Sequence, residues 1–130
     1  MKGDSMKVLK IGYLDGTDPM LLSYCAAMGF DTIPLSNGWD SHGKYLGLLT
    51  REDALALVVA PFHKLIPPSQ VQQKASDFVN ACRLQHVPLL VVVPEQVMGR
   101  ARRKLGGTRT GVLWCSPGEL FDKVMEILRR

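Results

Sequence analysis

The feature that most constrains the fold is a pair of continuous aliphatic runs, ALALVVA at residues 54–60 and VPLLVVV at residues 87–93. Strands with one face in water alternate apolar and polar residues, whereas these runs contain no polar position. They are typical of central strands in a parallel sheet that helices cover on both faces. Further apolar runs predict strands at residues 7–14, 30–35 and 111–115.

Helical patterns separate these runs, and their ends carry capping residues. Asp18 and Pro19 have the types preferred at the N-cap and first position of a helix, and Gly29 is expected to end that helix. Ser116 and Glu119 have capping-box spacing at the start of the last helix. Three further helices are expected, at residues 38–49, after Pro67-Pro68 with Ser69 and Gln72 as a capping box, and at residues 95–105.

Strands alternating with helices predict an α/β fold. We expect one domain at residues 7–130, a three-layer sandwich around a five-stranded parallel sheet, with residues 1–6 as a disordered lead. Pro34 cannot donate to a sheet ladder, which favours an edge position for the strand at residues 30–35. Together with right-handed crossovers, this predicts the flavodoxin-like order 2-1-3-4-5, with the strands numbered along the chain.

Three observations favour a cytoplasmic protein. No apolar run approaches the roughly 20 residues that span a bilayer, and the N-terminal residues contain no apolar signal-peptide core. The cysteines, Cys25, Cys82 and Cys115, lie far apart within apolar patterns, so we expect buried, reduced thiols.

Polar residues follow the predicted strands at the edge of the sheet where ligands bind in such folds. Asp15 and Thr17 follow the first strand, His63 follows the third and Cys115 closes the fifth, so these four are the candidate ligand-binding residues. A catalytic alternative would use Cys115 or Ser116 as nucleophile with His63 as base. The capping role of Ser116 and the apolar setting of Cys115 favour a binding module over an enzyme.

Known cofactor and metal patterns are absent from the sequence. Neither glycine-rich phosphate-binding motif occurs, and there is no C-x-x-C pair. The Asp-x-His-x-x-Gly pattern of cobalamin-binding domains is not met after the first strand. Asp15, Asp18 and Glu95 could converge on a divalent metal, but Asp18 is already explained as an N-cap. We therefore expect no cofactor and no metal.

The net charge of +4 lies entirely in residues 95–130, and no acidic residue occurs between Glu95 and Glu119. Positive charge of this kind forms either a solvated helix surface or a site for an acidic partner or a nucleic-acid backbone. No aromatic residue lies within the basic run, which argues against stacking of single-stranded bases. The candidate partner-binding residues are Arg100, Arg102, Arg103, Lys104 and Arg109.

Three stretches resemble a response-regulator receiver domain: KVLKIGYLDGTDPMLLSYCAAMGFDTIPLSNG, ALALVVA followed by Pro67-Pro68, and GVLWCSPGELFDKVMEIL. The resemblance implies a face for partners or self-association, formed by the helix at 95–105, the strand at 111–115 and the last helix. The family's catalytic residues do not carry over. Its phosphoacceptor aspartate falls at or next to Ala60, its magnesium-binding acids at Gly16-Thr17, its Ser/Thr near Val93-Pro94 and its lysine near Cys115-Ser116.

We therefore expect a non-catalytic, receiver-like regulatory or protein-interaction module that is not phosphorylated in the usual way. One alternative is a flavodoxin-like small-molecule-binding protein or enzyme with its site at the strand ends. The other is a nucleic-acid-associated accessory protein that uses residues 100–109.

Overall fold

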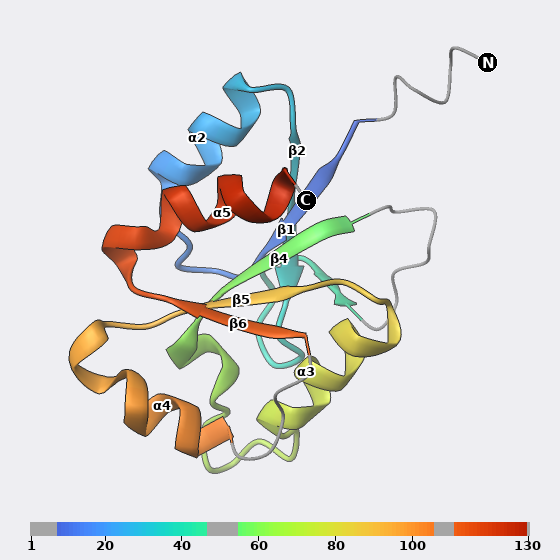
Figure 1. The fold of residues 1–130 in the computed structure, drawn as a ribbon. Helices are drawn as coiled ribbons and strands as arrows, with labels where there is room; N and C mark the ends of the chain where they lie inside the picture. Colours follow the sequence, from blue (N-terminus) through green and yellow to red (C-terminus); the bar gives the residue numbers. More distant parts are fainter. Residues whose placement is uncertain (1–7, 47–54, 106–110, 130) are drawn as a thin grey trace.

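The structure is a computed structural model that describes residues 8–46, 55–105 and 111–129 (Figure 1). The predicted lead at residues 1–6 and the candidate Arg109 lie outside the described residues. Within them the fold is α/β with an all-parallel sheet, as predicted. Its strands are β1 (Lys10–Tyr13), β2 (Asp31–Ser36), β3 (Lys44–Tyr45), β4 (Leu55–Pro61), β5 (Leu89–Val92) and β6 (Val112–Cys115).

The sheet differs from the prediction in strand count and order. Among the described residues it has six strands in the order β3-β2-β1-β4-β5-β6, so β2 is not an edge strand. Strand β3 pairs with β2 from Leu35 onward, immediately after Pro34, whose missing N–H therefore interrupts no bond to β3. Gly43 makes this pairing possible, because a Cβ at this position would collide with the Pro34 carbonyl oxygen.

Helices cover both faces of the sheet (Figure 1). Two of them, α2 and α5, share an apolar cluster with one face through residues such as Leu21 and Val124. The other two, α3 and α4, contribute Phe78 and Leu105 to the cluster on the opposite face. The bounds are α2 (Pro19–Ala27), α3 (Ala75–Leu84), α4 (Met98–Leu105) and α5 (Leu120–Leu128), with short 3-10 helices η3 (Phe62–Leu65), η4 (Glu95–Val97) and η5 (Pro117–Glu119).

Two predicted caps are confirmed. Asp18 Oδ1 accepts a hydrogen bond of 2.9 Å from the Met20 N–H at the start of α2. Glu119 Oε1 accepts bonds of 3.1 Å from both the backbone N–H and the hydroxyl of Ser116, just before α5. The segment predicted as a helix at residues 95–105 is also helical, as η4 and α4.

One helix prediction is wrong, and another is confirmed as α3 but wrong in where the helix begins. Residues 38–45 form bends and β3 rather than a helix, since glycines in this segment cost helix stability, and residues 47–49 lie outside the described part. The helix after Pro68 does not begin at Ser69. It begins at Ala75, where the Lys74 N–H donates a 2.9 Å hydrogen bond to Asp77 Oδ2, which caps the helix in place of the predicted Ser69 and Gln72.

The described helices are all too short or too polar to cross a lipid bilayer.

Candidate functional site

A tight turn after β1 holds two of the predicted site residues. The Leu14 carbonyl oxygen accepts hydrogen bonds from the Thr17 N–H at 3.3 Å and from the Thr17 hydroxyl at 2.7 Å. Gly16 makes the turn with a φ of +88°, a conformation that favours glycine. Thr17 is buried and its hydroxyl is used within the turn, so it acts as a structural residue here.

Asp15 extends from this turn into a small cluster of charged and aromatic groups. Its Oδ2 lies 3.4 Å from Lys64 Nζ, and its Oδ1 lies 3.7 Å from His42 Nε2. The other ring nitrogen of His42 is 3.1 Å from the Leu35 carbonyl oxygen. A carbonyl can only accept, so Nδ1 carries a proton and Nε2 faces Asp15. The Tyr13 ring packs edge-on against His42, with centroids 5.4 Å apart.

The sequence predicted neither His42 nor Lys64 as a site residue. The signal that could have found His42 is the run NGWDSHG directly after β2. Buried Asn37 in this run ties the loop to the segment after β4, because its Nδ2 donates a 2.9 Å hydrogen bond to the Lys64 carbonyl oxygen. The loops that follow β1, β2 and β4 are therefore joined at the Asp15 cluster.

His63 and Cys115, the other two predicted site residues, occupy different environments. His63 is exposed in η3, and its ring lies beside Gly16, 3.8 Å from where a Cβ would stand. Cys115 is buried in the apolar cluster beneath α5. No described contact connects Cys115 to Asp15, Thr17 or His63, so the four residues do not form one site.

The thiols are poorly suited to nucleophilic chemistry. Burial, reinforced by the nearby Glu119 carboxylate and partly offset by Lys123, raises the pKa of Cys115 to about 11. Burial raises the pKa of Cys82 to about 12 and also raises the pKa of Cys25. These three cysteines are buried and unpaired, as the sequence predicted.

The resemblance to receivers would put the phosphoacceptor at or next to Ala60. The residue is fully buried at the carboxyl end of β4, beside Val91 of β5, and it belongs to the apolar cluster under α3. Among residues 8–46, 55–105 and 111–129, no group of three or more His, Cys, Asp or Glu side chains could hold a metal ion.

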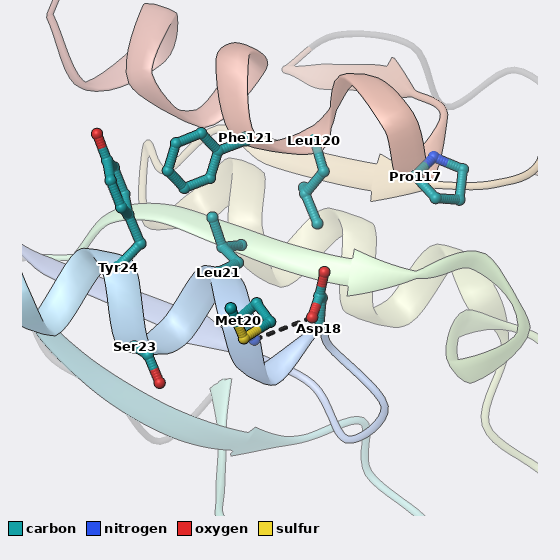
Figure 2. A pocket seen from close by; sticks show the side chains of 8 residues that line it. All are labelled: Asp18, Met20, Leu21, Ser23, Tyr24, Pro117, Leu120 and Phe121. Carbon is teal, nitrogen blue, oxygen red and sulfur yellow. Dashed lines mark hydrogen bonds between the residues drawn. The ribbon is translucent and has the colours of Figure 1, made fainter.

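Two adjoining cavities lie on the α2 and α5 side of the strand ends. The smaller, of about 230 Å³, is lined by Gly16, Thr17, Asp18, Pro61, Val92, Pro117 and Leu120. The larger, of about 420 Å³, shares three of these residues and continues between the two helices, lined by Asp18, Met20, Leu21, Ser23, Tyr24, Pro117, Leu120 and Phe121. Figure 2 shows Leu21 and Tyr24 of α2 extending towards Leu120 and Phe121 of α5 across this space, which we call the α2–α5 groove.

The exposed side of α2 carries apolar side chains as well as the exposed Ser23. Only Leu21 and Cys25 of the helix are buried, while the Met20 side chain is 74% exposed and Tyr24 is 39% exposed. No charged residue occurs from Pro19 to Met28. The Tyr24 ring contacts Phe121 of α5, with centroids 3.8 Å apart, and so joins the two walls of the groove.

The described basic residues predicted to bind a partner all project from α4. Arg100, Arg102, Arg103 and Lys104 are exposed on this helix. One aromatic ring does accompany them, contrary to the sequence-based expectation, because the Arg102 guanidinium lies 5.5 Å from the centroid of Trp114 in β6. This cation–π contact fixes one of the four charges over the edge strand.

Neither a scan against protein-family models nor a search of curated proteins gives a match for this chain.

Proposed function

We propose that this protein is a non-catalytic, receiver-like regulatory module that works by binding a protein partner in the α2–α5 groove. The observation that carries the proposal is the charge-free, exposed surface of α2. A helix on a protein surface normally presents charged or polar residues to water. Exposed apolar patches beside a hollow are typical of interaction sites, and Met20, at 74% exposure, lines this hollow.

The groove suits a helix of the partner that presents apolar side chains. Its walls are two helices, and amphipathic helices commonly bind in such grooves through side chains three and four residues apart. Tyr24 and Phe121 supply an aromatic pair at one end, and Leu120 lines the groove further along. Aromatic side chains of this kind contribute a large share of binding energy at interfaces.

Two features support a function without phosphoryl transfer or thiol chemistry. The resemblance would put the phosphoacceptor at or next to Ala60, and Ala60 is a buried residue with a methyl side chain, which leaves no carboxylate nucleophile there. Cys115 is buried, and its pKa of about 11 keeps the sulfur protonated at neutral pH.

A photo-crosslinking experiment tests the proposal. A photoreactive phenylalanine analogue is placed at Met20, and in a second protein at Leu84, an exposed leucine of α3 on the opposite face. We expect a partner to crosslink from position 20 and not from position 84. The purified partner should then bind Met20→Asp at least about tenfold more weakly than wild type, as for an interface hot spot, and bind Leu84→Asp normally. Equal affinity for Met20→Asp and wild type would contradict the proposal.

A second candidate function is binding of a small molecule at the strand ends. The 230 Å³ cavity favours it, because this space adjoins the groove at the crevice where ligands bind in such folds. Thermal-shift measurements with FMN, nucleotides, cobalamin, and acetyl phosphate with Mg²⁺ test it. Stabilisation by one compound that Leu120→Trp abolishes would favour this function over partner binding.

Nucleic-acid binding is the third candidate, favoured by the four exposed cations of α4. Retention on DNA or RNA should then fall steeply with salt, because phosphate contacts release counterions. Retention that is unchanged in Arg100→Glu/Arg103→Glu would exclude α4 as the nucleic-acid surface.

A further inference from the structure

Strand β6 forms one edge of the sheet, and no described strand pairs with its outer side (Figure 1). On its inner side, the Leu89 and Val93 N–H groups of the β5 chain donate 3.0 Å hydrogen bonds to the carbonyl oxygens of Gly111 and Cys115. Along a strand, the N–H and C=O groups of one residue point to one side, and those of the next residue point to the other side. The N–H and C=O groups of Val112 and Trp114 are therefore directed away from β5, towards the open edge.

The side of this edge next to α4 is positively charged. Arg102 lies over the Trp114 ring at 5.5 Å, and Arg100, Arg103 and Lys104 are exposed on the same helix. No acidic residue between Glu95 and Glu119 is present to neutralise them. A side chain that reached this side of the sheet from an added strand would meet a cationic surface.

The side next to α5 has the opposite charge. A cavity of about 240 Å³ lies between β6 and α5, lined by Trp114, Cys115, Glu119, Asp122, Lys123 and Glu126. The cavity therefore has three carboxylates, from Glu119, Asp122 and Glu126, and one ammonium group, from Lys123. Lys123 Nζ lies 3.7 Å from Glu126 Oε1. The net charge of this cavity favours a cation.

We propose that β6 binds an extended segment of a partner protein as an additional strand, with acidic side chains towards α4 and basic side chains towards the α5 cavity. Successive side chains of a strand point to opposite faces, so a segment with alternating acidic and basic residues satisfies both surfaces at once. Main-chain hydrogen bonds to Val112 and Trp114 supply affinity, as in other cases of strand addition. This surface does not involve α2, so the inference goes beyond the proposed groove function and is independent of it.

The charges argue against a second copy of this chain as the occupant. Two β6 edges related by a twofold axis would pair antiparallel and keep the same sheet faces together. The basic α4 helices of the two copies would then lie side by side, and so would the two acidic cavities. Like charges brought together at an interface are costly, whereas a segment with alternating charge gains on both faces.

Selection from a random decapeptide display library tests the inference. The wild-type protein is immobilised at low salt, and the enriched peptides are sequenced. We expect acidic residues at every second position with basic residues between them. Affinity for a selected peptide should fall at least about tenfold in Arg103→Glu and in Asp122→Lys, since each reverses the charge of one residue on one of the two surfaces.

A main-chain test separates strand addition from charge attraction alone. Val112→Pro removes one outward N–H, a position where an edge strand tolerates proline, and Val112→Thr is the control that keeps it. We expect loss of binding only in Val112→Pro. A second measurement uses the wild-type protein, so it does not depend on whether the Val112→Pro variant folds. In it, alternate amides of the peptide are N-methylated. One alternate set should abolish binding and the other should leave it intact, since only every second residue bonds across an edge.

Other outcomes would overturn the inference. Selected peptides without charge alternation, or ones that tolerate both N-methylated sets, would exclude strand addition. A homodimer that Val112→Pro dissociates would identify a second copy as the occupant. If no peptide binds, but the Met20→Asp variant still binds the crosslinked partner more weakly than wild type does, this inference is rejected and the groove function stays in place.

Discussion

Lys64 Nζ lies 3.4 Å from Asp15 Oδ2, so an ammonium from the segment after β4 is paired with the carboxylate that follows β1. His42 approaches the same carboxylate from the loop after β2. Asp15 is thus a junction between three loops. Its side chain is nevertheless 54% exposed, and ion pairs in contact with water contribute little to stability.

Asp15 and Asp18 lie close together in sequence and should differ in their effect on stability. Asp18→Ala removes the N-cap of α2 and should lower the free energy of unfolding by about 1 kcal/mol, within a range of roughly 0.5–2. Asp15→Asn should cost about 0–1 kcal/mol, and this cost should shrink at high salt. Urea unfolding followed by circular dichroism at low and high salt measures both. A larger, salt-insensitive loss in Asp15→Asn would contradict the assignment.

The turn after β1 depends on the left-handed conformation of Gly16. Gly16→Ala should lower the free energy of unfolding by about 1–3 kcal/mol, because a Cβ is strained at a φ of +88°. Gly118→Ala is the matched control, since a Cβ there would have nothing within 4 Å. Thermal and urea unfolding of the two variants should differ clearly, and equal stabilities would show that the turn does not require glycine.

Replacing Ala60 tests the relation to receiver chemistry. Ala60→Asp should destabilise the protein by several kcal/mol, because it buries a carboxylate in an apolar cluster. Ala60→Ser should cost less, since its hydroxyl is uncharged. Incubation with acetyl phosphate and Mg²⁺ should add no phosphoryl group to wild type or to either variant, as intact-mass spectrometry would report. A phosphoryl adduct on the wild-type protein would contradict the non-catalytic proposal.

The buried thiols predict a loss of stability at high pH. Burial raises the pKa of Cys115 to about 11 and of Cys82 to about 12, from an ordinary value of 9.0. The folded state therefore holds these protons more tightly than the unfolded chain does. Their stabilising contribution is complete below about pH 9 and is lost as the pH rises towards 11 and 12.

Unfolding experiments between about pH 8 and pH 10 check this, since each thiol adds a slope of at most about 1.4 kcal/mol per pH unit. Cys115→Ala and Cys82→Ala should each show a shallower fall in unfolding free energy than wild type. Both thiols should also react slowly with iodoacetamide in the folded protein, and rapid alkylation at neutral pH would contradict the raised pKa values.

Local sequence patterns predicted those elements whose structure is determined by residues close together in the chain. The aliphatic runs in β4 and β5 predicted buried parallel strands, and the caps at Asp18 and Ser116 follow from hydrogen bonds within a few residues. Strand β3 was not predictable in this way. Its two residues pair with β2 only because Gly43 lets the backbone pass close to Pro34, a contact that no periodicity reveals.

The candidate site was predicted less well because its contacts join distant loops. Asp15 was identified from its place after a strand, but its partners, His42 and Lys64, depend on how three loops converge. The apolar composition of α2 was visible in the sequence. Which of its side chains remain exposed depends on how α2 sits beside α5, and this decides that Met20 and Tyr24 border a groove rather than fill a core.

The uncharged surface of α2 and the charged surface of α4 should respond to salt in opposite directions. Ions screen the arginines of α4 and weaken any contact that depends on them. Salts such as sulfate strengthen the burial of apolar surface, and would tighten any contact made through Met20 and Tyr24. Because the two helices lie on opposite faces of the sheet, we expect ionic strength to select which of the two proposed surfaces binds a partner.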